Sequence, residues 1–341
     1  MSRPCSVLLL LLVVTRPAAA QSAGPVSWTL ASGEFTIYGH TDYTPTLALL
    51  PRIVYDTSRG RDSARIVDSV RLARADRAGL AAGLTAWPSG SYCGGVTSGT
   101  MQTLEPRLLL GHVQLAARCG VRVVLVAPRR LLTANGQPNG LFSVDSAKRL
   151  TDRYAAALPA DTLRKYRATI LGMNLADDYN CTACWGGRVI TQAQIAGWAS
   201  YARARLPGLP LGVRKTPDWV AAYPALVPLL DYTWAQYDTR RGDAQAYYDE
   251  AANIAKRLGL RVVMGINVVH CYGSGTATCA AADLVRIGTL AVSHPGSCAF
   301  LNWKYEEATW QQPDVRAAWE GLLALARARP ARECRRGESG V

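Results

Sequence analysis

A segment near the middle of the chain combines an apolar run with two acids. Residues 171–176 alternate large apolar side chains with small or polar ones, which predicts a strand. On this alternation, Gly172, Asn174 and Asp178 share one face, and Asp177 points the other way, toward the surrounding helices or the loop that it would cap. Because a lone carboxylate is costly to bury, we expect Asp178 to line a wet cleft at the end of the strand.

This strand belongs to a regular alternation of strands and helices. Eight strands are predicted, over residues 34–40, 80–87, 121–127, 168–176, 209–214, 230–238, 261–269 and 298–305. Eight helices are predicted, over residues 63–78, 104–118, 143–157, 191–206, 218–227, 243–258, 280–293 and 314–327. The alternation predicts parallel strands, and the count favours a single (β/α)8 TIM barrel with long βα loops stabilised by disulfides. An open nucleotide-binding sheet is the weaker alternative, because the sequence has no Gly-rich phosphate turn.

The two ends of the chain differ in composition from the barrel. Residues 1–20 carry Arg3, a short apolar run and Ala18-Ala19-Ala20, which is typical of a signal peptide that is removed before Gln21. No later apolar stretch is long enough to span a membrane. We therefore expect a secreted or periplasmic monomer whose barrel covers residues 21–330. Residues 331–341 are expected to form a basic, disordered tail.

Eight cysteines follow the predicted signal peptide, and an even number in an exported chain favours disulfides. Cys271 and Cys279 bracket a short loop and are predicted to be joined. Cys181 and Cys184 could instead form a redox pair or half of a zinc site. Because no second pair stands at ligand spacing, we favour structural disulfides and predict neither a metal nor a cofactor.

The net charge of +13 raises the question of a nucleic-acid partner. The arginines are scattered along the predicted helices, and no basic-aromatic motif of the kind that binds bases is present. A solvated arginine-rich surface explains the charge equally well, so we do not predict nucleic-acid binding.

Polar and aromatic residues recur where the predicted strands end, and in a TIM barrel these ends converge on one face. Acids and amides can bind sugar hydroxyls, and aromatic rings can stack on sugar rings, so this mixture predicts a carbohydrate site. The candidate catalytic residues are Asp178, Glu306 and Asp238. The candidate substrate-binding residues are His40, Trp87, Asn174, Arg214, Trp234, Gln236, Asn267, Trp303 and Lys304.

Several candidates have a structural alternative. Trp234 and Trp303 could pack in the core, because the pattern does not separate the two faces of their strands. Asp238 precedes Thr239-Arg-Arg241 and could pair with an arginine, and Arg214 could be an internal counter-ion for Asp178.

A second pattern concerns glycines placed two residues before a polar side chain, which should make room inside the barrel. It occurs at Gly83, Gly172, Gly212 and Gly265.

The chain resembles the glycoside-hydrolase superfamily of (β/α)8 barrels, and specifically its uncharacterised secreted members. The resemblance rests on residues 174–178 with Trp185-Gly-Gly187, on residues 231–238 and on residues 302–306. The fourth strand lacks the Asp-x-x-Asp-x-Asp-x-Glu pattern of chitinases. It is loosely similar to α-galactosidase-type barrels, and that similarity implies nucleophile and acid/base roles for Asp178 and Asp238.

These observations predict a carbohydrate-active hydrolase that cleaves a glycosidic bond of an oligo- or polysaccharide with two carboxylates. Asp178 is the expected nucleophile or base, and Glu306 or Asp238 the expected general acid. A catalytically silent barrel that binds polysaccharide or a cell-wall partner would need the same residues. A thiol oxidoreductase that uses Cys181 and Cys184 is the third and weakest interpretation.

Overall fold

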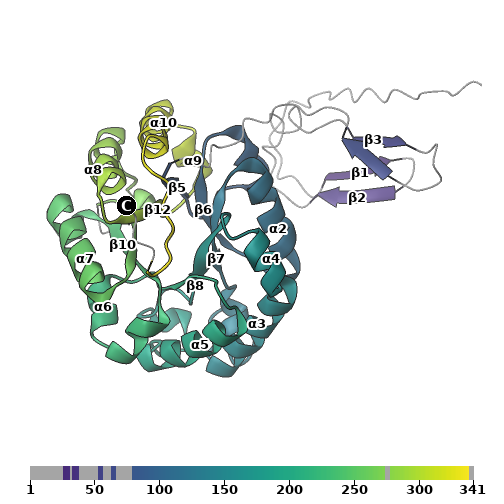
Figure 1. Cartoon of the computed structure of the whole chain (residues 1–341). Helices are drawn as coiled ribbons and strands as arrows, with labels where there is room; N and C mark the ends of the chain where they lie inside the picture. The colour runs from purple at the N-terminus through teal and green to yellow at the C-terminus, as the bar shows by residue number, and fades with distance from the viewer. Residues whose placement is uncertain are drawn as a thin grey trace, which may run out of the picture. The chain divides into compact units, whose positions relative to one another are not determined.

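The computed structural model describes residues 79–272 and 277–337 in full, and the backbone of 26–30, 33–37, 53–56 and 63–66. The chain divides into two units, residues 1–50 and residues 51–341. The second unit contains an eight-stranded parallel sheet that closes into a barrel surrounded by helices (Figure 1). The predicted TIM barrel is confirmed.

Eight short strands form the barrel. They are β5 (Ala81–Leu84), β6 (Gly99–Thr103), β7 (Arg122–Val126), β8 (Ile170–Asn174), β9 (Leu211–Gly212), β10 (Tyr232–Tyr237), β11 (Arg261–Ile266) and β12 (Ser297–Asn302). Their hydrogen-bonded order runs from β6 through β12 and then to β5. Two backbone hydrogen bonds join β5 to β6, from Ser98 N to Ala82 O and from Ala86 N to Met101 O. These bonds bring the first and last members of the sheet together.

Helices follow the strands from β6 onward. They are α2 (Pro106–Cys119), α3 (Val144–Ala157), α4 (Ala160–Lys165), α5 (Gln192–Arg205), α6 (Pro217–Ala221), α7 (Ala244–Leu258), α8 (Ala281–Ser293), α9 (Glu307–Trp310) and α10 (Pro313–Arg327). Side-chain caps begin three of them: Ser143 for α3, Thr191 in a capping box with Gln194 for α5, and Asp243 for α7. For six of the eight predicted helices, both ends lie within two residues of the observed ends.

The first predicted strand lies outside the barrel. Strand β2 (Gly33–Ile37) pairs antiparallel with β1 (Val26–Leu30) in a two-stranded sheet. The barrel strand that the sequence pattern missed is β6, where small and polar residues predict a loop. Thr97, Ser98 and Thr100 are nevertheless fully buried, and their hydroxyls donate to backbone carbonyls of β5 and its neighbours. Hydrogen bonding thus makes up for the missing apolar side chains.

The helix predicted over residues 63–78 is wrong at its start. Strand β4 (Ser63–Ile66) pairs antiparallel with β3 (Ile53–Asp56), and residues 67–78 lie outside the described residues. Ile66 and Val70 have helical spacing, but β-branched residues also favour strands. Between β5 and β6 the structure has a 3-10 turn, η2 (Ser89–Gly94), in place of a helix.

The core has an inner and an outer layer. The outer layer lies between the strands and the helices, and the inner layer fills the barrel with residues that include Met101, Tyr232 and Trp234. A side chain at Gly172 or Gly212 would collide with the ring of Tyr232, so these two glycines do make room inside the barrel. Gly83 and Gly265 instead lie against the backbone of neighbouring strands, at Gly99 and Leu301.

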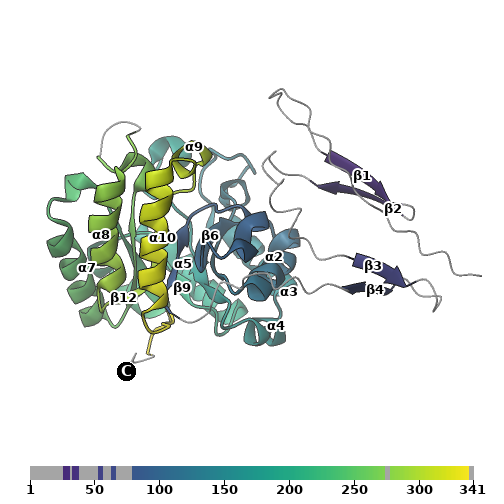
Figure 2. The ribbon, with the colours of Figure 1, turned by 90° about the horizontal axis from the view of Figure 1, so that it is seen from above.

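Four disulfides join the eight cysteines of the second unit. They are Cys93–Cys119, Cys181–Cys184, Cys271–Cys279 and Cys298–Cys334. The predicted bond between Cys271 and Cys279 is confirmed, and the disulfides fit an extracellular protein. The bond Cys298–Cys334 also fixes part of the C-terminal tail, because Cys334 is buried with the inner-layer residues. Residues 331–337, predicted to be disordered, are therefore anchored beneath α10 (Figure 2).

The predicted signal peptide, residues 1–20, and His40 lie outside the described residues. No helix among the residues that the structure describes has both the length and the apolar character needed to cross a membrane.

Candidate active site

The C-terminal end of β8 departs sharply from extended backbone. The strand ends at Asn174, and two non-glycine residues just beyond it, Ala176 and Asp178, have φ values of 77° and 53°. A third, Ala86, has φ 59° just beyond the end of β5. Such left-handed residues cost about 1–2 kcal/mol each and concentrate at functional sites. Strained backbone therefore marks the mouth of the barrel at two strand ends.

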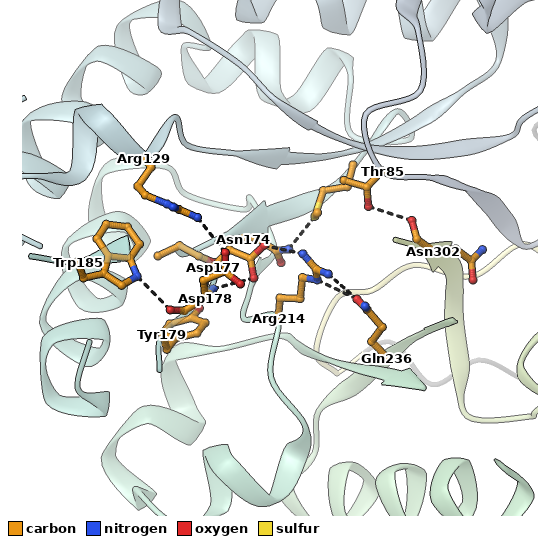
Figure 3. Close-up of polar contacts among 12 residues, drawn as sticks. Thr85, Arg129, Asn174, Asp177, Asp178, Tyr179, Trp185, Arg214, Gln236 and Asn302 are labelled. Atoms are coloured by element: carbon orange, nitrogen blue, oxygen red, sulfur yellow. Dashed lines mark hydrogen bonds and ion pairs between the residues drawn. The ribbon is translucent and has the colours of Figure 1, made fainter. Parts of the chain in front are cut away.

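This turn reverses the predicted facing of the two acids. Asp177 binds Arg214, which follows β9, whereas Asp178 binds Arg129, which follows β7 (Figure 3). The side chain of Asp177 is 24% exposed and that of Asp178 is 50% exposed. The prediction extended strand alternation past Asn174, and the left-handed residue Ala176 breaks that alternation.

Arg214 connects three parts of the mouth. Its Nη1 donates to Asp177 Oδ2 at 2.5 Å, and its Nε and Nη2 donate to Gln236 Oε1 at 3.0 and 2.6 Å. Its guanidinium carbon lies 4.3 Å from the ring centroid of Trp303 and 5.7 Å from that of Trp234. Arg214 is thus a counter-ion, as one interpretation expected, but its partner is Asp177 and not Asp178. It holds an acid, an amide and an aromatic ring in one cluster.

The loop after β8 holds Asp178 by its backbone as well as its side chain. Arg129 Nη2 donates to Asp178 Oδ2 at 2.8 Å. The Asp178 carbonyl accepts hydrogen bonds from Trp185 Nε1 at 3.1 Å and from Cys181 N at 2.8 Å. Arg129 also lies 5.4 Å from the ring centroid of Trp185. Trp185 is fully buried, so the carboxylate is held by a fixed loop while remaining accessible to solvent.

The electrostatic environment favours the protonated form of Asp178. Partial burial raises the pKa of its carboxyl, and the negative charge of Asp177 raises the pKa further. The positive charges of Arg214, Arg129 and Lys215 act in the opposite direction without cancelling the increase. A raised pKa in a solvent-accessible carboxyl is the property that a general acid needs.

Two candidate binding residues, Asn174 and Trp234, are already hydrogen bonded or buried inside the barrel. Asn174 accepts from Tyr232 Oη at 3.0 Å and donates to Met101 Sδ at 3.2 Å, so its amide is occupied inside the barrel. Trp234 is 1% exposed and forms part of the inner core. In the part of the chain that the structure describes, Trp234 Nε1 and Asn267 Oδ1 are buried without a hydrogen-bond partner. Core packing therefore explains Trp234 better than ring stacking does.

Asp238 and Trp87 have structural roles, one as a cap and the other in aromatic packing. Asp238 is buried, accepts from Arg240 Nε and Nη2, and caps the 3-10 turn that follows β10. Burial acts to raise the pKa of Asp238, but the hydrogen bonds and charge of Arg240 outweigh it and lower the pKa. Trp87 is 2% exposed and packs edge-on against Tyr305 and Trp310.

Glu306 and Lys304 lie at the rim beyond β12. Lys304 Nζ is 3.3 Å from Glu306 Oε1, and both side chains are more than one-third exposed. Lys304 Nζ also lies 5.7 Å from the ring centroid of Trp303. This places the ion pair beside the aromatic ring that Arg214 contacts, so Glu306 remains a candidate acid.

Three residues near the mouth were not among the predicted site residues: Asp177, Arg129 and Lys215. Arg129 and Lys215 each lie within three residues of a strand end, as do Arg214 and Trp303. Closeness to the end of a strand could therefore have identified both residues as site candidates. No group of three or more potential metal ligands occurs within the described residues, and Cys181 and Cys184 are joined to each other.

Comparison with known proteins gives similarity of fold. No protein-family model and no curated protein sequence matches the chain. Among solved structures, SrfJ from Salmonella typhimurium has a TM-score of 0.50 at 12% identity, covering 79% of this chain and 80% of SrfJ. This chain shares its fold. A β-mannanase from Streptomyces thermolilacinus, solved with mannohexaose, has a TM-score of 0.49 at 11% identity and covers 75% and 92% of the two chains. The mannanase catalytic domain from Streptomyces sp. SirexAA-E has a TM-score of 0.47 at 12% identity, with 66% and 75% covered.

Proposed function

We propose that this protein is a secreted carbohydrate-active hydrolase whose chemistry is centred on Asp178. The observation that carries the proposal is the pair of adjacent acids, Asp177 and Asp178, held by different arginines at the mouth of a TIM barrel. Their environments differ: Asp177 is partly exposed and paired with a mostly buried arginine, and Asp178 is half-exposed with a raised pKa. Carboxylates in contrasting environments suit glycosidic cleavage, which needs an acid and an anionic partner.

In this proposal Asp178 is the general acid that protonates the departing glycosidic oxygen. Asp177, paired with Arg214, supplies the negative charge that stabilises the cationic sugar ring in the transition state. Trp303 is partly exposed and provides a ring on which a sugar can stack. Glu306 is the alternative second carboxylate, because it lies beside the same ring. Asp238 is disfavoured as an acid because its pKa is lowered.

The test is the release of reducing ends from a panel of polysaccharides. Asp178→Asn should lower turnover by about 10²–10⁴-fold, the usual contribution of a general acid. Asp238→Asn is the matched comparison, because it removes a carboxylate at another strand end. It should keep most of the turnover while losing about 1 kcal/mol of stability with its capping interaction. Full turnover by Asp178→Asn would refute the assignment.

A catalytically silent carbohydrate-binding barrel is the second candidate. The observation that favours it is the neutralisation of both acids, because Asp177 and Asp178 each form an ion pair with an arginine. Polysaccharide binding without release of reducing ends by the wild-type protein would favour this candidate over the hydrolase.

A further inference from the structure

Two cations lie beyond the ends of β9 and β10. Lys215 follows Arg214, and Arg241 ends the 3-10 turn η6 (Thr239–Arg241). Lys215 Nζ lies 5.8 Å from the ring centroid of Tyr179, and Arg241 Cζ lies 5.7 Å from that of Tyr247. Each cationic side chain therefore rests near an aromatic ring at the mouth.

These two cations differ from the others around the mouth. Arg129, Arg214, Arg240 and Lys304 each form an ion pair with a carboxylate. Within the residues that the structure describes, no carboxylate lies within ion-pair distance of Lys215 or Arg241. The site therefore has positive charge that its own acids do not neutralise by contact.

The electrostatics of Lys215 agree with this imbalance. Burial lowers the pKa of its ammonium, and the charge of Arg241 lowers the pKa further. The carboxylates of Asp177, Asp178 and Asp218 act in the opposite direction, but the pKa remains lowered. An anion beside Lys215 would offset both unfavourable effects on its ammonium.

We propose that Lys215 and Arg241 bind an anionic substituent, a carboxylate or a sulfate, on the carbohydrate that occupies the mouth. The proposal rests on the proposed function for its carbohydrate ligand and narrows the substrate class to acidic glycans. Lys215 directly follows Arg214, which binds Asp177, so the anionic group would lie on a sugar at or next to the scissile bond. Tyr179 is fully buried, so its ring positions Lys215 beside the mouth and does not stack on the sugar.

The experiment measures binding separately from turnover. Asp178→Asn protein is titrated calorimetrically with an oligogalacturonate, a sulfated galactan oligosaccharide and a neutral manno-oligosaccharide of matched length. We expect the acidic ligands to bind more tightly and to lose affinity as salt rises. Adding Lys215→Met, which keeps the apolar stem but removes the charge, should weaken acidic binding about tenfold or more and leave neutral binding unchanged.

Lys148→Met is the matched control. Lys148 Nζ lies 5.7 Å from the ring centroid of Tyr201 on helices α3 and α5, so this change removes the same charge and a similar ring contact elsewhere. It should leave the binding of every ligand unchanged. Arg241→Gln should weaken the same acidic ligands as Lys215→Met does.

The outcomes separate this inference from the proposed function. Preference for neutral ligands, no binding of either acidic ligand, or acidic binding insensitive to Lys215→Met would overturn the anion site. Acidic binding that depends on Lys215, without turnover by the wild-type protein, would support the anion site and refute the hydrolase. The ratio of oligogalacturonate to sulfated-ligand affinity identifies which anion the site prefers.

Discussion

Asp177 and Asp178 adjoin in sequence but should respond differently to the same substitution. Asp177→Asn leaves the guanidinium of Arg214, which is only 12% exposed, without its ion-pair partner. We expect it to lower the free energy of unfolding by about 1–3 kcal/mol. Asp178→Asn breaks an ion pair at the exposed rim, where such pairs contribute only about 0–1 kcal/mol, and it also removes the cost of partly burying the carboxylate, so it should not lower stability near neutral pH. Urea unfolding of the two variants measures the difference, and equal losses would contradict the contrast in environment.

The raised pKa of Asp178 predicts a pH-dependent difference in stability. A carboxyl whose folded pKa lies above its unfolded value favours folding below the unfolded pKa, and this stability is lost as pH rises through the folded pKa. Asp178→Asn should therefore melt like the wild type near pH 3 and on the order of 2 °C higher at pH 7. Thermal melts at both pH values test the sign. A variant that is less stable at pH 7 would show that the ion pair with Arg129 outweighs burial.

At this scale, position along a strand placed some residues at the mouth correctly, whereas Trp87 and Trp234, chosen in the same way, are buried in the core. Arg214, Gln236 and Trp303 were placed at the mouth because strand ends converge, and the structure brings them into contact. The facing of Asp177 and Asp178 could not be predicted, because it depends on the left-handed backbone of Ala176. Alanine gives no sequence signal for that conformation, unlike glycine or asparagine.

At the scale of elements, the arginine-rich tail stabilises the bottom of the barrel. Arg329 Nη1 donates to Ser293 O at the end of α8, and Arg336 Nη2 donates to Leu258 O at the end of α7. Cations at helix C-termini satisfy carbonyl groups that lack helical partners and interact favourably with the helix dipole. Part of the net charge of +13 therefore has a structural role.

The disulfide that anchors this tail should contribute strongly to stability. Cys298 and Cys334 are 36 residues apart, so the chain-entropy relation gives about 4 kcal/mol for replacing both with alanine. Cys181 and Cys184 are 3 residues apart, and the same relation gives about 2 kcal/mol for the control Cys181→Ser/Cys184→Ser. Denaturant unfolding of both double variants measures the two losses. A larger loss in the control would mean that the loop after β8, rather than the tail, limits stability.

Helices were easier to predict than strands, for identifiable reasons. Capping residues such as Ser143, Thr191 and Asp243 mark helix starts, and Gly120 and Gly259 mark ends in the left-handed conformation. Strand β6 lacks such markers, and the buried hydroxyl of Thr100 donates to Leu84 O on the neighbouring strand β5, which is distant in sequence. Its partners are distant in sequence, and local patterns do not report them.

At the scale of the whole molecule, the predicted count of eight strands was correct, although one member was misassigned. A strand at residues 34–40 replaced β6 in the prediction, and β8 kept its fourth position in the barrel. The regular alternation from β6 onward was sufficient to indicate the fold. The identity of the first strand depended on long-range pairing between β5, β6 and β12.

The barrel should therefore fold without the first 50 residues. Every strand of its sheet lies between Ala81 and Asn302, and Leu80 N donates to Ala326 O, which ties the start of β5 to the end of α10. A chain that begins at Pro51 should unfold in one cooperative transition, with a melting temperature within about 5 °C of the chain that begins at Gln21. Circular dichroism melts of both chains test this, and the reducing-end assay should give equal turnover. A shortened chain without cooperative unfolding would show that residues 21–50 contribute to the barrel core, because the eight strands alone would then be insufficient for stability.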